Sequence, residues 1–228
     1  MAPTITHKAG IAGASQATGP TLVIDTFRAF STAAYLFDAG VDRLILADGL
    51  DEARRVAQGL DGALLVGEDD GIQPADFNLG NSPAQVLERT DLAGATIVMR
   101  TSAGTRSVIA ADSSGASPIL ATSLVVATAT AAAVRSEPQV TIVAAGLNGV
   151  EPADEDDATA ALLEALLSGA SHDHPAMVDA LRSGTGGRRL LDTPSIDDTD
   201  LELCLAVDAF DFAMRAGLEG GFLVLDKD

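Results

Sequence analysis

The chain has 228 residues, of which 47% are hydrophobic, and this is enough apolar material for a compact domain. Its 33 acidic residues outnumber its 14 basic residues, and the resulting net charge of −19 excludes DNA, RNA and anionic membrane surfaces as partners. One cysteine cannot form an internal disulfide bond or a zinc site, and this usage fits a reducing cytoplasm. We expect a cytoplasmic protein without a membrane span, because we find no signal-peptide pattern and no apolar run near the roughly 20 residues that cross a bilayer.

Apolar runs that alternate with helical patterns predict one α/β domain over residues 1–228. Residues 1–19 show no usable period, and we expect a flexible tail or an edge strand around Ile5. Two final runs separated by a glycine-rich turn predict a closing antiparallel hairpin, at residues 210–215 and 222–225. The expected buried strands lie at residues 22–24, 43–47, 63–66, 95–99, 119–120 and 140–145.

The first buried strand ends directly in Asp25, and Arg28, Ser31 and Thr32 follow within the next helix. Ligands of parallel sheets bind at the carboxyl ends of the strands, so Asp25 lies where a metal ligand or a nucleophile would be. Arg28 and the two hydroxyls could bind an anion. The alternative is structural: Asp25 caps the helix, and Arg28 pairs with it on the surface.

Three further strands also end in polar segments. Glu68 follows the third strand within Gly-Glu-Asp-Asp-Gly, where adjacent carboxylates require a metal, an arginine or solvent to offset their repulsion. The fourth strand leads into Arg100-Thr101-Ser102-Ala103-Gly104-Thr105-Arg106, which could form a phosphate cradle or a plain Ser/Thr turn. Glu155 and Asp156 begin an Ala/Leu helix, where they could bind a divalent cation or only stabilise the helix terminus.

Two other segments carry weaker signals. Asn81 or Ser82, before Pro83, fits the cap of a helix and adds hydroxyl and amide groups. Residues 183–189, Ser-Gly-Thr-Gly-Gly-Arg-Arg, are predicted to form a loop that could bring cations to an anion. This segment is a poor P-loop candidate, because no strand precedes it and the motif's lysine is missing.

The recurrence of polar strand ends predicts one site. In a parallel sheet these ends share one edge, where carboxylates could hold Mg²⁺ while arginines and hydroxyls bind phosphoryl oxygens. We assign Asp25, Arg28 and Glu68 to catalysis. The candidate metal ligands are Asp25, Glu68, Glu155 and Asp156. The candidate substrate-binding residues are Ser31, Thr32, Asn81, Ser82, Arg100, Thr101, Ser102, Gly104, Thr105 and Arg106.

Five blocks, in this order, resemble the 2-phosphosulfolactate phosphatase (ComB-like) family: DTFRAFSTA, GEDDG, FNLGNSP, RTSAGTR, and AAG with a downstream EDD. The resemblance covers residues 21 to about 167 and continues more faintly to 225. The matching positions are Asp25, Arg28, Thr32, Glu68, Gly80, Asn81, Ser82, Thr101, Gly104, Thr105, Glu155 and Asp156.

The resemblance implies a three-layer α/β/α fold with a mostly parallel or mixed central sheet. It also implies Mg²⁺-dependent hydrolysis of a small phosphorylated acid, above all 2-phosphosulfolactate to sulfolactate and phosphate, in the coenzyme M route or a related one. The expected partner is a small anionic phosphorylated substrate, and a homodimer is compatible with the family. Whether Asp25 binds the metal or forms an aspartyl-phosphate stays open.

The sequence departs from the family pattern at several positions, and Ala103 is the most consequential. It stands where the family has asparagine, so a donor to phosphate is lost, and one such donor can stabilise a transition state by about 3 kcal/mol. Phe30 and Ala144 replace a hydroxyl residue and a cysteine. The alternative function is therefore a non-catalytic anion-binding or regulatory protein with a degenerate site.

Overall fold

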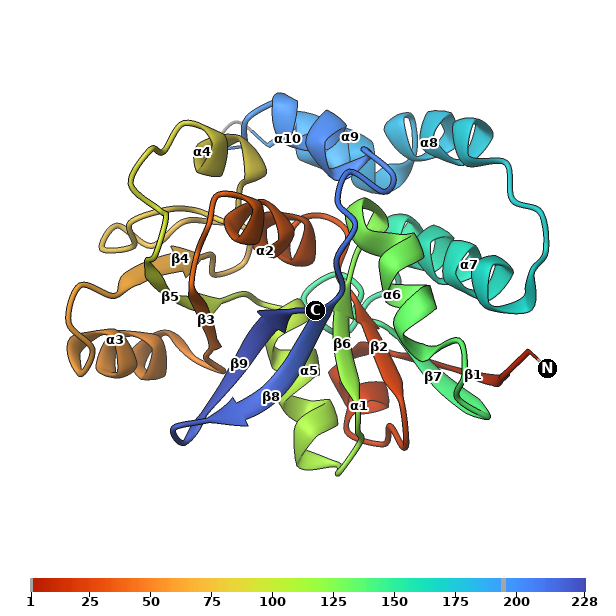
Figure 1. Ribbon diagram of the computed structural model, residues 1–228. Coiled ribbons are helices and arrows are strands. Elements are labelled where there is room, and N and C mark those ends of the chain that lie inside the picture. Colours follow the sequence, from red (N-terminus) through yellow and green to blue (C-terminus); the bar gives the residue numbers. More distant parts are fainter. Residues whose placement is uncertain (1, 194–195) are drawn as a thin grey trace.

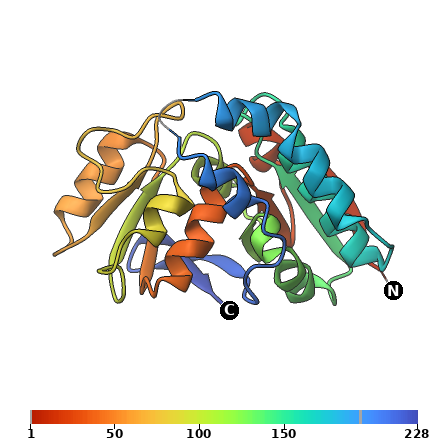
Figure 2. The ribbon, with the colours of Figure 1, turned by 90° about the horizontal axis from the view of Figure 1, so that it is seen from above.

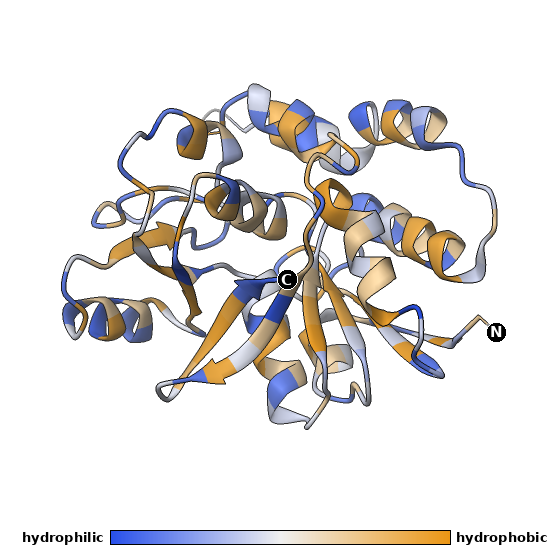
Figure 3. Ribbon diagram, viewed as in Figure 1, coloured by the Kyte–Doolittle hydropathy of each residue, from blue (hydrophilic) through white to orange (hydrophobic). Residues whose placement is uncertain are grey.

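The apolar runs pair into one mixed sheet in the computed structural model, which describes residues 2–193 and 196–228 (Figure 1). In this part of the chain the sheet has nine strands, in the order β1-β7-β2-β6-β8-β9-β3-β5-β4. Most strand residues are hydrophobic, as Figure 3 shows. The strands are β1 (Thr4–Ala9), β2 (Thr21–Ile24), β3 (Arg43–Leu46), β4 (Leu64–Gly67), β5 (Thr96–Arg100), β6 (Ile119–Thr122), β7 (Gln139–Ala144), β8 (Met214–Glu219) and β9 (Phe222–Lys227).

Two parallel groups of strands flank an antiparallel hairpin. Strands β1, β7, β2 and β6 form one parallel group, and β3, β5 and β4 form the other. The pairs β6–β8, β8–β9 and β9–β3 are antiparallel, so the two groups run in opposite directions along the sheet. The expected closing hairpin is thus confirmed, but its first strand is Met214–Glu219 rather than the predicted 210–215, and the hairpin lies inside the sheet.

We expected the strand ends to meet because they share one edge of a parallel sheet. This expectation is wrong, because the two parallel groups run in opposite directions. Adjacent strands are rotated by about 20–25°, and this twist accumulates to roughly 100° over the five strand pairs between β2 and β5. Figure 2 shows the two parallel groups on opposite sides of α2 (Ala29–Asp38). The twist allows the carboxyl ends of both groups to approach each other despite their opposite directions.

Helices cover both faces of the sheet and make a three-layer arrangement. On one face, α1, α2 and α5 pack in a core with Val23, Leu44 and Met99. On the other face, α6 and α7 cover Leu22 and Ile24, while α3 covers β3 and β5. The other helices are α1 (Gly10–Ala14), α3 (Leu50–Gln58), α4 (Pro83–Leu87), α5 (Gly104–Ser113), the 3₁₀ helix η1 (Leu124–Val126), α6 (Ala127–Val134), α7 (Asp154–Ser168), α8 (His174–Arg182), α9 (Thr185–Leu191) and α10 (Thr199–Cys204).

The strand ends β4 and β5 meet at a position that requires glycine. Gly67 has φ +136, and a Cβ atom there would overlap the carbonyl oxygen of Arg100. The Glu68 N–H then donates to the same oxygen at 3.0 Å. This close approach places Glu68 beside the turn that follows β5.

Other expectations are met or corrected by the fold. Residues 4–9 form an edge strand, and Ser82 is the cap of α4, where its Oγ accepts from the Gln85 N–H. The predicted loop at 183–189 is wrong, because most of it is the start of helix α9, whose glycines Gly186 and Gly187 are buried against neighbouring carbonyl and carboxylate oxygens. Among the described residues, no helix combines the length and the apolar character needed to cross a membrane.

Candidate functional site

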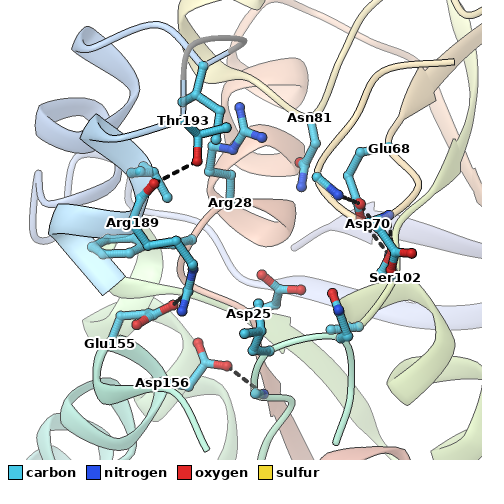
Figure 4. A pocket seen from close by; sticks show the side chains of 18 of the residues that line it. Asp25, Arg28, Glu68, Asp70, Asn81, Ser102, Glu155, Asp156, Arg189 and Thr193 are labelled. Carbon is cyan, nitrogen blue, oxygen red and sulfur yellow. Dashed lines mark hydrogen bonds and ion pairs between the residues drawn. The ribbon is translucent and has the colours of Figure 1, made fainter. Parts of the chain in front are cut away.

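The carboxyl ends of β2, β4, β5 and β7 contribute residues to one pocket. Figure 4 shows Asp25, Glu68, Ser102, Glu155 and Asp156 around it, from segments distant in the sequence. The pocket has a volume of about 210 Å³, which suits a small molecule. Its lining residues are Asp25, Phe27, Arg28, Glu68, Asp70, Gly71, Ile72, Asn81, Ser102, Ala103, Gly146, Leu147, Asn148, Glu155, Asp156, Arg189, Leu190, Thr193 and Ile196.

Asp25 lies at the end of β2, buried at the base of the pocket. Its Oδ1 accepts a hydrogen bond from the Ala29 N–H at 3.2 Å, so it does bind the start of α2. Burial above all, together with the negative charge of Glu68, nevertheless raises the pKa of Asp25 to about 6, against the lowering effect of the Ala29 and Gly104 N–H groups. Helix capping alone does not explain why an acidic side chain is buried where its charged form is disfavoured.

Asp156 and Glu155 come from the first turn of α7 and are 3% and 2% exposed. The two Asp156 oxygens accept from the N–H groups of Thr26 and Gly146, each at 2.8 Å. Glu155 Oε1 accepts from Arg189 at 3.0 Å, while the buried Oε2 has no partner. Acids that only stabilised a helix dipole would be solvated, so their burial indicates a further role.

The acidic side chains repel one another. Burial above all, together with the neighbouring Asp154 carboxylate, raises the pKa of Glu155 to about 7, although the charge of Arg189 lowers it. Burial also raises the pKa of Asp156 well above its usual range, and the nearby charges of Asp25 and Glu155 add to this effect. A cation near these groups would relieve the repulsion and restore ordinary acidity.

Glu68 is held differently, because both of its oxygens accept hydrogen bonds from neighbouring loops. Oε1 accepts from the Ser102 N–H at 2.5 Å, and Oε2 accepts from Ser102 Oγ at 3.0 Å and from the Gly71 N–H at 2.6 Å. Ser102 Oγ in turn accepts from the Asp70 N–H at 3.0 Å. Glu68 and Ser102 therefore join the β4 and β5 ends into one wall of the pocket.

Arg28 pairs with a carboxylate that sequence reasoning missed. Its Nη1 donates to Asp200 Oδ2 at 2.9 Å, and both side chains are buried. Asp200 Oδ1 also accepts from Ser82 Oγ at 2.8 Å and from the Ala84 N–H at 2.9 Å. The predicted surface pair between Arg28 and Asp25 is thus replaced by a buried one, and Ser82 is turned toward Asp200.

Several predicted substrate-binding residues lie outside the pocket lining. Ser31 Oγ donates to the Thr26 carbonyl, and Thr32 is fully buried in α2. Arg106 pairs with Asp48 at the surface. A further group shapes the β5 turn through internal hydrogen bonds or close packing, and it consists of Arg100, Thr101, Gly104 and Thr105.

The pocket brings in Arg189 and Ala103 as well. Arg189 lies on α9, and its position in the pocket was indicated in the sequence only by the cationic character of residues 183–189. Ala103 is 7% exposed and lines the pocket, so the missing family asparagine would have faced the site. Asn81 also lines it, and its buried Oδ1 has no partner.

The carboxylates of the pocket offer part of the ligand set that a divalent cation requires. Within residues 2–193 and 196–228, no three histidine, cysteine or acidic side chains lie close enough together to hold a metal between them. Mg²⁺ commonly uses only one or two carboxylates and completes its shell with water and substrate phosphate. The anchored carboxylates of Asp25 and Asp156 fit that requirement.

A family model described as 2-phosphosulpholactate phosphatase matches residues 7–217, which is most of the chain. The chain belongs to the 2-phosphosulpholactate phosphatase family. It is therefore a phosphatase of the phosphoric monoester hydrolase class. The family resemblance drawn from the five sequence blocks is confirmed by this match.

Relatives from distant organisms carry the same name, "probable 2-phosphosulfolactate phosphatase". The relative from Thermoplasma volcanium is 29% identical over 190 residues, which cover 83% of this chain and 85% of the relative. The one from Deinococcus radiodurans is 37% identical over 150 residues, or 64% and 61% of the two chains. The one from Bacillus subtilis is 25% identical over 213 residues and covers 90% of both.

Proposed function

We propose that this phosphatase hydrolyses the phosphate monoester of a small acidic hydroxy acid in a Mg²⁺-dependent reaction, with 2-phosphosulfolactate as the leading substrate. The observation that carries the proposal is the cluster of three buried carboxylates, Asp25, Glu155 and Asp156, in one pocket with Arg28. The names of the relatives support the substrate.

Asp25 and Asp156 would hold the metal, and water and the substrate phosphate would complete its coordination shell. Backbone N–H groups fix Asp25 and Asp156 from elements on both sides, so little reorganisation is needed when a cation binds. A bound Mg²⁺ supplies neutralisation of the phosphoryl charge and a lowered pKa of bound water. We retain both roles for Asp25, metal ligand or nucleophile, as alternatives.

Arg28 would orient the phosphoryl group. Its pairing with Asp200 fixes one end of the guanidinium, while the pocket side of Arg28 stays available to an anion. A cation held in place before the substrate binds stabilises developing negative charge without further reorganisation. Ser102 would shape the opposite wall, because its N–H and O–H both donate to Glu68.

The test is phosphate release from 2-phosphosulfolactate and a panel of phosphorylated hydroxy acids, with Mg²⁺ or with EDTA. We expect release that EDTA abolishes, and at least a 1,000-fold lower rate for Asp25→Asn, in line with about 4 kcal/mol of lost transition-state stabilisation. The exposed Asp61→Asn is the matched control and should keep full activity. Absence of EDTA-sensitive release from every compound would refute the proposal and favour a non-catalytic protein, which Ala103 alone now suggests.

A further inference from the structure

The pocket has few positive charges for a site that accepts anions. Of the described residues that line it, five are acidic and two are arginines, Arg28 and Arg189. The wall opposite them contains Glu68, Asp70 and neutral residues. Within the described lining, a substrate with two anionic groups can therefore pair only with these two arginines and with the proposed cation.

The two arginines differ in how they are held. The Arg28 side chain is 7% exposed and forms a buried pair with Asp200. The Arg189 side chain is 34% exposed and makes a single ion-pair contact, from Nη2 to Glu155 Oε1 at 3.0 Å. The planar guanidinium carries further N–H groups besides the one that contacts Glu155, so Arg189 can also donate to a carboxylate or a similar anion in the pocket.

The helix that carries Arg189 is itself anchored at the pocket. Asp154 of α7 accepts hydrogen bonds from the N–H groups of Thr185 and Gly186, at 2.8 and 2.9 Å. Thr193 Oγ1 donates to the Arg189 carbonyl at 2.7 Å, and Leu190 packs in the core below. The backbone of Arg189 is thus fixed while its guanidinium can reorient within the pocket.

We propose that Arg189 binds the second anionic group of the substrate, a carboxylate or a sulfonate, while Arg28 binds the phosphoryl group. This inference rests on the proposed phosphatase function and names the residue that would recognise the second negative group of its substrate. The planar guanidinium can donate two parallel hydrogen bonds to such a group. When a cation occupies the acid cluster, Glu155 no longer needs Arg189 as its counter-charge.

Three esters with phosphate on the same secondary carbon test the inference. Isopropyl phosphate has no second charge, 2-phospholactate adds a carboxylate, and the phosphate ester of 2-hydroxypropane-1-sulfonate adds a sulfonate. We expect Arg189→Gln to lower kcat/KM by about 10- to 100-fold for the charged esters, which corresponds to one charged hydrogen-bonded contact. The loss of kcat/KM on isopropyl phosphate should be much smaller, because that ester has no second anionic group for Arg189 to bind. The matched control is Arg215→Gln, which removes a similarly exposed ion pair on β8 outside the pocket.

The outcomes separate this inference from the function on which it rests. If Arg189→Gln lowers kcat/KM for only one of the charged esters, Arg189 binds the anionic group of that ester. An equal decrease in kcat/KM for all three esters would overturn the inference but not the proposed phosphatase function. If the wild type releases no phosphate from any ester, the proposed function fails, and calorimetric titration with 3-sulfolactate, which has no phosphate, decides the subsite. The inference then requires that Arg189→Gln binds 3-sulfolactate more weakly than the wild type does. Equal affinity of the two proteins, or no binding of 3-sulfolactate by the wild type, would overturn it.

Discussion

Asp200 holds Arg28 beside the acid cluster, although 172 positions separate the two residues. The carboxylate is fully buried and accepts three hydrogen bonds, from Arg28, Ser82 and Ala84. Burial of such a pair contributes little net stability, but removal of one charge leaves the other buried without compensation. Arg28 would then lose both its orientation and its counter-charge.

We therefore predict that Asp200→Asn lowers kcat by about 100-fold and destabilises the fold by about 3 kcal/mol, the usual cost of breaking a buried pair. Phosphate-release kinetics and urea unfolding provide the measurements. Asp179→Asn is the control, because Asp179 pairs with Arg182 at the surface with a side chain 79% exposed. Wild-type kinetics and stability for Asp200→Asn would show that Arg28 does not depend on Asp200.

The acid cluster makes the stability of the metal-free chain depend on pH. The ordinary pKa values of Asp25 and Glu155 are 3.8 and 4.5, and the fold raises these pKa values to about 6 and about 7. The folded state therefore binds protons more tightly than the unfolded state, and the stability that this provides at low pH is lost as pH rises through the folded values. We predict a fall in stability between about pH 4 and about pH 7 in EDTA.

Urea midpoints across this pH range check the prediction, and Asp25→Asn separates the cluster from the general repulsion of a chain with net charge −19. The variant should lose less stability with rising pH than the wild type or the exposed control Asp61→Asn. Mg²⁺ should restore stability near pH 8 in the wild type and in Asp61→Asn but not in Asp25→Asn. Identical pH profiles for all three proteins would show that Asp25 is not strained by its surroundings.

At the scale of elements, the strand ends were predictable and their partners were not. An apolar run that stops at a carboxylate, as at Asp25 and Glu68, is a local signal that the structure places at a pocket. Asp200 and Arg189 come from short helices with no strand before them, so neither has such a signal. Their position depends on tertiary packing of α9 and α10 over the sheet, which no local pattern encodes.

In the hydroxyl-rich segments, by contrast, the sequence predicted substrate-binding residues that do not line the pocket. Ser31, Thr32, Thr101 and Thr105 looked like phosphate donors, yet their side chains are buried in α2 or paired within the β5 turn. A hydroxyl near a helix start can satisfy the backbone as readily as a ligand, and the sequence alone does not separate the two. Only Ser102 and Asn81 of the predicted hydroxyl and amide groups line the pocket.

At the scale of the whole molecule, an inserted hairpin decides where the strand ends meet. Strands β8 and β9 come last in the chain but lie in the middle of the sheet, and they reverse the direction of one parallel group relative to the other. The order of strands in the sequence does not reveal this insertion, whereas the strands themselves and the closing hairpin follow from periodicity. The accumulated twist then unites both groups of strand ends in one acidic pocket, within a molecule that already repels anions.

The central claim is that this pocket binds a divalent cation through Asp25 and Asp156. The most direct measurement is the anomalous diffraction of crystals grown with Mn²⁺, which takes the same oxygen ligands as Mg²⁺, and with 3-sulfolactate. Our account predicts an anomalous peak bonded to carboxylate oxygens of both Asp25 and Asp156. Crystals in which Mn²⁺ binds only elsewhere, or not at all at saturating concentration, would contradict it.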